Sequence, residues 1–143
     1  MVRLFDRRLC AVLLLAAAVA ACDDEPTPTG PSGPAPTVTD TFTGTIAPNG
    51  AGTHTFTVQG TGAIVGTLKN VGDDNTLVVS FALGNWDASR NACSVVLAND
   101  SATAGAILQG TMTAAGTLCA RIGDVGNIAA GKTAGYTIEV LHP

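Results

Sequence analysis

The chain has few side chains that can act as a general base or a nucleophile. His54 and His142 are its two histidines. His54 lies two residues before Phe56, so both point to the same face of an extended segment. The nucleophile elbow of serine hydrolases, Gly-x-Ser-x-Gly, does not occur. We therefore expect no enzyme and assign no catalytic residue.

Oxygen-bearing side chains recur in short segments rich in Gly and Asn. Calcium takes six to eight oxygen ligands from carboxylates, amides and carbonyls. The candidate ligands are Asp73, Asp74, Asn75, Asn99, Asp100, Asp124 and Asn127. No Asp-x-Asp-x-Asp-Gly loop is present, and Asp and Asn are common in turns because they bond to nearby backbone groups. Calcium is thus an alternative to plain turn chemistry, and we expect no other cofactor.

Trp86 is the one tryptophan and stands in a Gly-Asn-Trp-Asp segment. Its ring can stack on a sugar, which makes it a candidate ligand contact. It can also cap a hydrophobic core. We favour capping, because the rest of the chain after the Pro-rich segment offers few other aromatic side chains to fill a core.

The N-terminus has the layout of a secretory signal peptide. Three arginines precede an uncharged apolar run from Leu9 to Ala21. That run is shorter than the roughly 20 apolar residues of a membrane-spanning helix. Residues 1–21 are therefore predicted to direct export.

The end of this run, Val19-Ala20-Ala21-Cys22, resembles the lipobox of bacterial lipoproteins. The resemblance implies cleavage before Cys22 and attachment of a diacylglyceryl group, usually with an amide-linked acyl chain, to that cysteine. Two or more chains give stable membrane attachment. An ordinary signal peptide with an incidental cysteine is the alternative. We expect a lipid-anchored protein of the bacterial cell envelope, in the periplasm or on the cell surface.

Residues 22–39 join the anchor to the rest of the chain. Five of the seven prolines lie here among Thr, Ser and Gly, with little apolar surface to bury. Such a segment stays extended, at about 3 Å per residue where it resembles polyproline. We expect a flexible linker.

Two of the four cysteines remain after Cys10 leaves with the signal peptide and Cys22 takes the lipid. Disulfides form in the envelope rather than the cytosol. The Cys-x-x-Cys spacing that is typical of zinc sites does not occur in the chain. We expect Cys93 and Cys119 to pair, on strands that are neighbours or that face each other across a sandwich.

The charge balance excludes one class of partner. The formal net charge is −4, and loss of residues 1–21 makes it more negative by removing three arginines. Without clustered Lys and Arg the chain has no basic surface for nucleic acid.

Residues 40–143 form one predicted domain, in which apolar residues alternate with threonine and other polar residues. A period of two indicates strands with one buried face, and Gly-, Asn- and Asp-rich turns separate them. The predicted strands are about 40–47, 52–59, 62–69, 76–83, 92–98, 105–112, 116–122 and 134–141. Eight short strands indicate an all-β antiparallel sandwich.

Two segments resemble bacterial pre-peptidase C-terminal (PPC) domains. They are FTGTIAPNGAGTHTFTVQGTGAIVGTL, which opens the domain, and AAGTLCARIGDVGN with AGYTIEV, which closes it. The resemblance covers nearly all of residues 41–141. It implies a jelly-roll-like sandwich, found on secreted peptidases and surface proteins, with carbohydrate, collagen or other polymer binding in the wider group. The chain has Asn75-Thr76-Leu77-Val78 where an Asp-Leu-Asp-Leu-like run is common.

Together these features predict a non-enzymatic envelope lipoprotein that presents a β-sandwich binding, adhesion or structural module. Its expected partners are the membrane, through the lipid, and a glycan or an envelope protein. The alternative is a calcium-stabilised accessory or inhibitor domain that binds a partner protein such as a peptidase. The sequence leaves the oligomeric state open.

Overall fold

The computed structural model describes residues 37–143. The predicted signal peptide, the predicted lipidation site Cys22 and the predicted linker up to residue 36 lie outside the described residues. In the described part, no helix is long and apolar enough to cross a membrane.

The described residues form eight strands joined by turns and loops. In chain order the strands are β1 (Val38–Ile46), β2 (Ala51–Val58), β3 (Gly62–Val71), β4 (Val79–Asp87), β5 (Ala92–Ala102), β6 (Ile107–Met112), β7 (Gly116–Asp124) and β8 (Ala134–His142).

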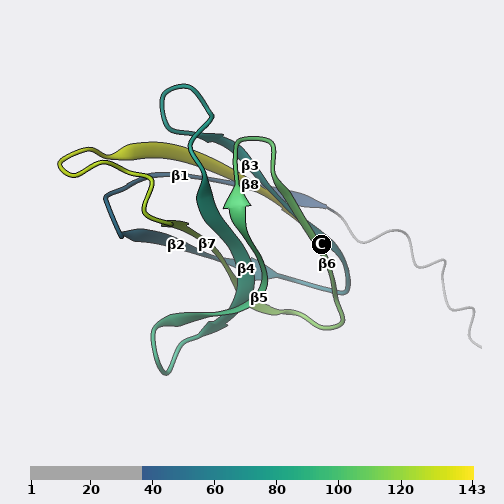
Figure 1. Cartoon of the computed structure of the whole chain (residues 1–143). Helices are drawn as coiled ribbons and strands as arrows, with labels where there is room; N and C mark the ends of the chain where they lie inside the picture. Colours follow the sequence, from purple (N-terminus) through teal and green to yellow (C-terminus); the bar gives the residue numbers. More distant parts are fainter. Residues whose placement is uncertain (1–36) are drawn as a thin grey trace, which may run out of the picture. The chain divides into compact units, whose positions relative to one another are not determined.

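The strands form two four-stranded antiparallel sheets (Figure 1). One sheet has the order β1-β8-β3-β6 and the other β2-β7-β4-β5. Successive strands cross from one sheet to the other except at the β4–β5 hairpin. This is the strand order of a jelly roll, which confirms the predicted eight-stranded antiparallel sandwich.

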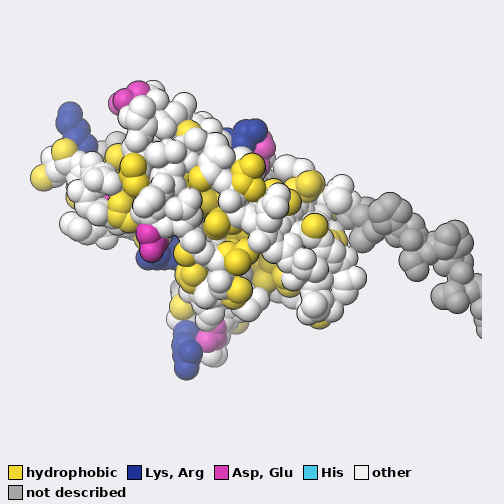
Figure 2. Space-filling model, turned by 45° about the vertical axis from the view of Figure 1, so that its right-hand side comes forward, with side chains coloured by type: hydrophobic (Ala, Val, Ile, Leu, Met, Phe, Trp, Pro, Cys, Tyr) yellow, Lys and Arg dark blue, Asp and Glu magenta, His cyan; other side chains and the backbone are white. Residues whose placement is uncertain are grey.

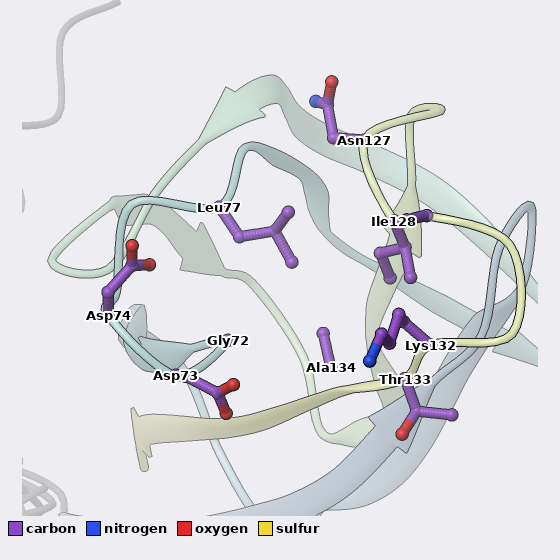
Figure 3. Close-up of a pocket in the computed structure, with 10 residues that line it drawn as sticks. Gly72, Asp73, Asp74, Leu77, Asn127, Ile128, Lys132, Thr133 and Ala134 are labelled. Atoms are coloured by element: carbon purple, nitrogen blue, oxygen red, sulfur yellow. The ribbon is translucent and has the colours of Figure 1, made fainter.

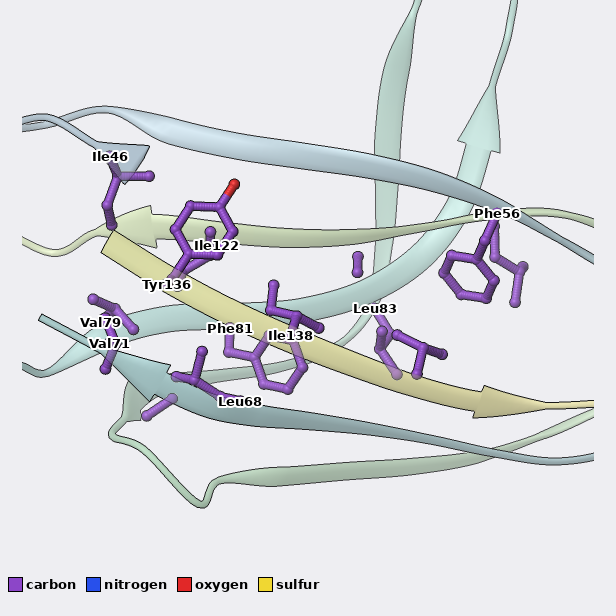
Figure 4. Packing of buried hydrophobic residues seen from close by; sticks show 14 of the residues in the cluster. Ile46, Phe56, Leu68, Val71, Val79, Phe81, Leu83, Ile122, Tyr136 and Ile138 are labelled. Atoms are coloured by element: carbon purple, nitrogen blue, oxygen red, sulfur yellow. The ribbon is translucent and has the colours of Figure 1, made fainter. Parts of the chain in front are cut away.

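Alternation along each strand builds the core between the sheets. On β8, Tyr136, Ile138 and Val140 are buried, while Thr137 and Glu139 between them are half-buried on the outer face. The opposite sheet contributes a matching inward row, which includes Phe56, Phe81, Leu83 and Ile122 (Figure 4). Because the two sheets share this one core, neither is expected to be stable alone.

The start of β4 differs from the sequence prediction. The strand begins at Val79 rather than at residue 76, and it extends to Asp87. Residues before it are held in a turn, because Asp74 Oδ1 accepts hydrogen bonds from both the backbone N–H and the hydroxyl of Thr76. Asn75 has a positive φ of 62°, a conformation that strands do not use.

The connections gather at two ends of the sandwich. The loop end carries residues 47–50, 72–78, 103–106 and 125–133. Backbone hydrogen bonds tie these connections to the sheets, for example from Asp124 N–H to the Gly50 carbonyl. At the opposite end, Val38 pairs with His142. We call that end the terminal end.

Candidate functional site

His54 of β2 links the two sheets. Its Nε2 lies 2.8 Å from the hydroxyl of Tyr136 on β8, and its ring stacks on Phe42 of β1 with the centroids 4.9 Å apart. Burial lowers the pKa of His54 and raises the pKa of Tyr136. Both groups are therefore mainly neutral at pH 7. The tyrosine hydroxyl donates to Nε2 when the imidazole proton is on Nδ1.

Two glycines make room for this tyrosine. A Cβ on Gly44 of β1 or on Gly52 of β2 would overlap the Tyr136 hydroxyl. Both glycines lie within strands, where glycine often marks the close approach of another group. The sequence analysis did not identify this arrangement. The sequence feature that could have indicated the buried tyrosine is a glycine in each of the two strands that flank the β1–β2 turn.

His142 of β8 is nearly fully buried and has two hydrogen-bond partners. Its Nε2 lies 3.1 Å from Asp40 Oδ2, and its Nδ1 lies 3.1 Å from the Pro143 carbonyl oxygen. Phe56 packs against its ring with the centroids 5.2 Å apart. The Asp40–His142 pair therefore fastens the beginning of β1 to the end of β8.

In the part of the chain that the structure describes, neither histidine is hydrogen-bonded to a serine, threonine, cysteine or lysine side chain. Their hydrogen bonds go to Tyr136, Asp40 and a carbonyl group. Every buried side-chain nitrogen or oxygen among residues 37–143 has a hydrogen-bond partner. These contacts give both histidines a structural role, and the absence of enzymatic activity stays a prediction.

Asp124 organises the loop between β7 and β8. Its Oδ1 accepts hydrogen bonds from the backbone N–H groups of Gly126, Asn127 and Ile128. Its Oδ2 accepts one from the N–H of Asn49 in the β1–β2 turn. These hydrogen bonds lower the pKa of Asp124, and the bond from Asn49 has the largest effect.

Asn75, Asn99 and Asp100, three more of the predicted calcium ligands, also accept hydrogen bonds. Asn75 Oδ1 accepts from the N–H of Val71. On β5, Asn99 Oδ1 accepts from the N–H of Ser101, and Asp100 Oδ1 accepts from the Ser80 hydroxyl. The bond of Asn75 is that of a turn, which supports turn chemistry for this residue. Asn99 and Asp100 lie within β5, which continues to Ala102 rather than ending at residue 98.

The predicted calcium ligands are only partly brought together. Asp73, Asp74 and Asn127 line one hollow, whereas Asn99 and Asp100 lie on β5. Over residues 37–143, no group of three His, Cys, Asp or Glu side chains is placed to hold a metal ion. The same hollow is lined by Lys132, whose positive charge disfavours a cation. Calcium binding stays an untested alternative.

The hollow at the loop end is open and has a volume of about 250 Å³. Leu77, Ile128 and Ala134 supply its apolar surface. Figure 3 shows Asp73 and Lys132 on either side of Ala134. The hollow lies at the lower limit of ligand sites in size, so it suits one small polar group with an apolar side. The sequence analysis did not identify Lys132 or the apolar residues.

Trp86 lies far from this hollow. It is near the end of β4 and pairs with Cys93 of β5, whereas β4 starts at the loop end. Trp86 is half-buried and belongs neither to the core cluster nor to the residues packed against it. The prediction that it caps the core is wrong, because β4 extends beyond the core and carries Trp86 into the hairpin. Its role as a ligand contact stays a prediction.

The predicted disulfide between Cys93 and Cys119 is present, with a Cα–Cα distance of 5.8 Å. The strand arrangement expected for it is wrong. β5 and β7 are neither hydrogen-bonded neighbours nor on opposite sheets, because β4 lies between them in one sheet. Strands that flank a third are normally about 9.6 Å apart.

Gly84 of β4 explains how the bond forms. The β4–β5 register shifts between Leu83 and Gly84. A Cβ on Gly84 would overlap the backbone of Ser94. The absence of a side chain at residue 84 therefore lets β5 bend over β4, which brings Cys93 within reach of Cys119 on β7.

Neither a protein-family model nor a curated protein sequence matches this chain. The likeness to PPC domains therefore continues to rest on the quoted segments and on the fold they imply.

Proposed function

We propose that this chain is a bacterial envelope lipoprotein, anchored through Cys22, whose PPC-like jelly roll binds a ligand with its loop end. The observation that carries the proposal is the position of the first strand. β1 begins at Val38 at the terminal end, opposite the connections that form the loop end. A domain held by its N-terminal linker presents the loop end farthest from its point of attachment.

The chemistry of the loop-end hollow supports a glycan as the ligand. Asp73 and Asp74 supply acceptors, Lys132 and Thr133 supply donors, and Leu77 supplies apolar surface. Sugars present hydroxyl groups around a ring that has apolar faces, so they need this mixture. A peptide side chain of a partner protein is the competing ligand.

The calcium-stabilised accessory domain is a second candidate. It is supported by Asp73, Asp74 and Asn127, which border the same hollow. In that case the loops would be ordered by the ion and would bind a partner such as a peptidase. Isothermal titration with calcium, in the presence and in the absence of a partner peptidase, separates the calcium-stabilised accessory domain from the glycan-binding domain.

Mass spectrometry of the N-terminal peptide tests the anchor. The protein isolated from membranes should begin at Cys22 and carry the mass of the lipid, and Cys22→Ala should carry none. An unmodified peptide that begins at another residue would contradict the anchor.

A glycan array tests the ligand. The Cys22→Ala variant, which carries no lipid, serves as the reference and should bind glycans on the array. Adding Lys132→Ala to this variant should abolish that binding. Lys69→Ala is the matched control, because Lys69 is an exposed lysine on β3 that pairs with Glu139 at 3.1 Å and does not line the hollow. Equal loss of binding in both lysine variants, or no hits, would contradict glycan binding at the loop end.

A further inference from the structure

The sandwich has four edge strands: β1 and β6 in one sheet, β2 and β5 in the other. An edge strand exposes backbone groups that can pair with another chain, and proteins usually protect it with charges, prolines or bulges. β1 carries Asp40, and β5 has two register irregularities against β4. β6 contains no charged residue and no proline, and it pairs regularly with β3 over its whole length.

β2 is also uncharged, but its outer face carries exposed threonines, whereas β6 lies beside exposed apolar side chains. Ile107 of β6 is 56% exposed, and Val95 and Val96 of β5 are 48% and 65% exposed. The two strands meet where Leu97 Cδ1 lies 3.2 Å from the position of a Cβ on Gly110. We call β6 together with Val95 and Val96 the β6 side.

The β6 side lacks the charges that would repel a second copy of the chain. The chain carries a formal net charge of −4, so two copies repel each other in most orientations. The β6 strand and the neighbouring stretch of β5, residues 93–99, contain no charged residue. In the view of Figure 2, hydrophobic side chains spread across the middle of the face, with charged ones at its margins.

The sequence of β6 is suited to pairing with itself. In an antiparallel pair centred on Gln109, the two Gln109 amides lie opposite each other and can exchange hydrogen bonds. Leu108 then lies opposite Gly110 of the second copy, so this pair does not set two large side chains against each other. Gln109 is exposed, so its amide is accessible to the second copy.

We propose that β6 pairs antiparallel with β6 of a second copy, centred on Gln109, and so joins two four-stranded sheets into one. The two-fold axis makes the contact self-complementary and closed. A foreign partner fits less well, because the β6 side has no charged or aromatic anchor to select one. The inference does not depend on the lipid anchor or on the ligand at the loop end.

Cysteine cross-linking in the full chain tests the pairing. Gln109→Cys places two thiols opposite each other across the axis, so mild oxidation should give a disulfide-linked dimer. Thr43→Cys is the matched control, since Thr43 is exposed on β1, the other edge of the same sheet. Equal dimer yield from both variants, no dimer from Gln109→Cys, or a cross-link to a different protein would overturn the proposal.

A charge substitution provides a second test that needs no oxidation. Gln109→Lys should raise the dimer dissociation constant by about fivefold, which corresponds to roughly 1 kcal/mol for like charges placed opposite each other. Thr43→Lys adds the same charge on the other edge and should leave the constant unchanged. Analytical ultracentrifugation over a concentration series measures both. A wild-type protein that stays monomeric, or equal effects of both lysines, would overturn the proposal.

Discussion

The hydroxyl of Tyr136 lies 2.8 Å from Nε2 of His54 and joins the two sheets beside the β1–β2 edge. A hydrophobic core has no directional bonds, so this contact helps to define how the sheets are placed on each other. It also brings a titratable group into the space between them.

Stability should decrease as the pH falls below neutral. Burial lowers the pKa of His54 in the folded protein below the ordinary histidine value of 6.5. His54 therefore binds a proton more readily in the unfolded chain than in the folded protein. The contribution of neutral His54 to stability is fully present above pH 6.5 and is lost as the pH falls through the folded pKa. Melting temperatures between pH 7.5 and pH 5 measure this loss.

The variant His54→Gln isolates that contribution. Glutamine can still bond to Tyr136 but does not titrate, so the variant should show a shallower decrease over the same pH range. The contact between His142 and Asp40 is unchanged in this variant. Identical pH profiles would show that His54 is not responsible.

Adding a methyl group beside Tyr136 should destabilise the fold. Gly52→Ala places a Cβ on the Tyr136 hydroxyl, and overpacking of this kind costs about 1–3 kcal/mol. The cost should shrink in a Tyr136→Phe background, where the hydroxyl is absent. Urea denaturation of the four proteins in this double-mutant cycle gives the coupling.

Gly60→Ala is the control for this cycle, because a Cβ at residue 60 meets no atom within 4 Å. It should change the free energy of unfolding little in either background. A Gly52→Ala cost that is the same with Tyr136 and with Phe at residue 136 would contradict the steric explanation.

Reduction of the disulfide should destabilise the protein. The bond joins residues 26 apart, for which the chain-entropy model gives about 3.5 kcal/mol. A reducing agent should lower the melting temperature of the wild type and leave that of the double variant Cys93→Ala/Cys119→Ala unchanged. Free thiols at these positions in the unreduced, unfolded protein would contradict the bond.

Chelation should leave the melting temperature unchanged. Asp74 and Asp124 already accept hydrogen bonds from neighbouring groups, so folding satisfies these carboxylates without an ion. A ligand that binds only the native state would raise the melting temperature. Calorimetry with EDTA and with millimolar calcium decides the matter, and a calcium-dependent rise would favour the accessory-domain alternative.

Much of the fold follows from local patterns. Strands such as β8 alternate strictly between buried and less buried residues, and a turn with Asn49 at positive φ separates β1 from β2. Period-two patterning and turn residues act within a few positions, so they can be recognised in the sequence. The start of β4 was misplaced because the side chain of Asp74 competes with the strand for the backbone of Thr76.

The contacts of the candidate site depend on strand order, which the sequence does not encode locally. His54 and Tyr136 are 82 residues apart and meet only because β2 and β8 lie in facing sheets. The cysteine count predicted which residues pair, but the bend over Gly84 arises from a register shift between two strands. Trp86 was misplaced because it pairs with Cys93 of β5, beyond the end predicted for its strand at residue 83.

The attachment of β1 has a mechanical consequence. Its nine residues all pair with β8, from Val38 at the terminal end to Ile46 at the loop end. When the loop end is held and residue 38 is pulled, the force runs along β1, at right angles to its hydrogen bonds. The whole ladder must then shear at once, whereas a sideways pull would open it one bond at a time. Under the proposed function, tension between the N-terminal anchor and a ligand at the loop end would load the strand in its most resistant direction.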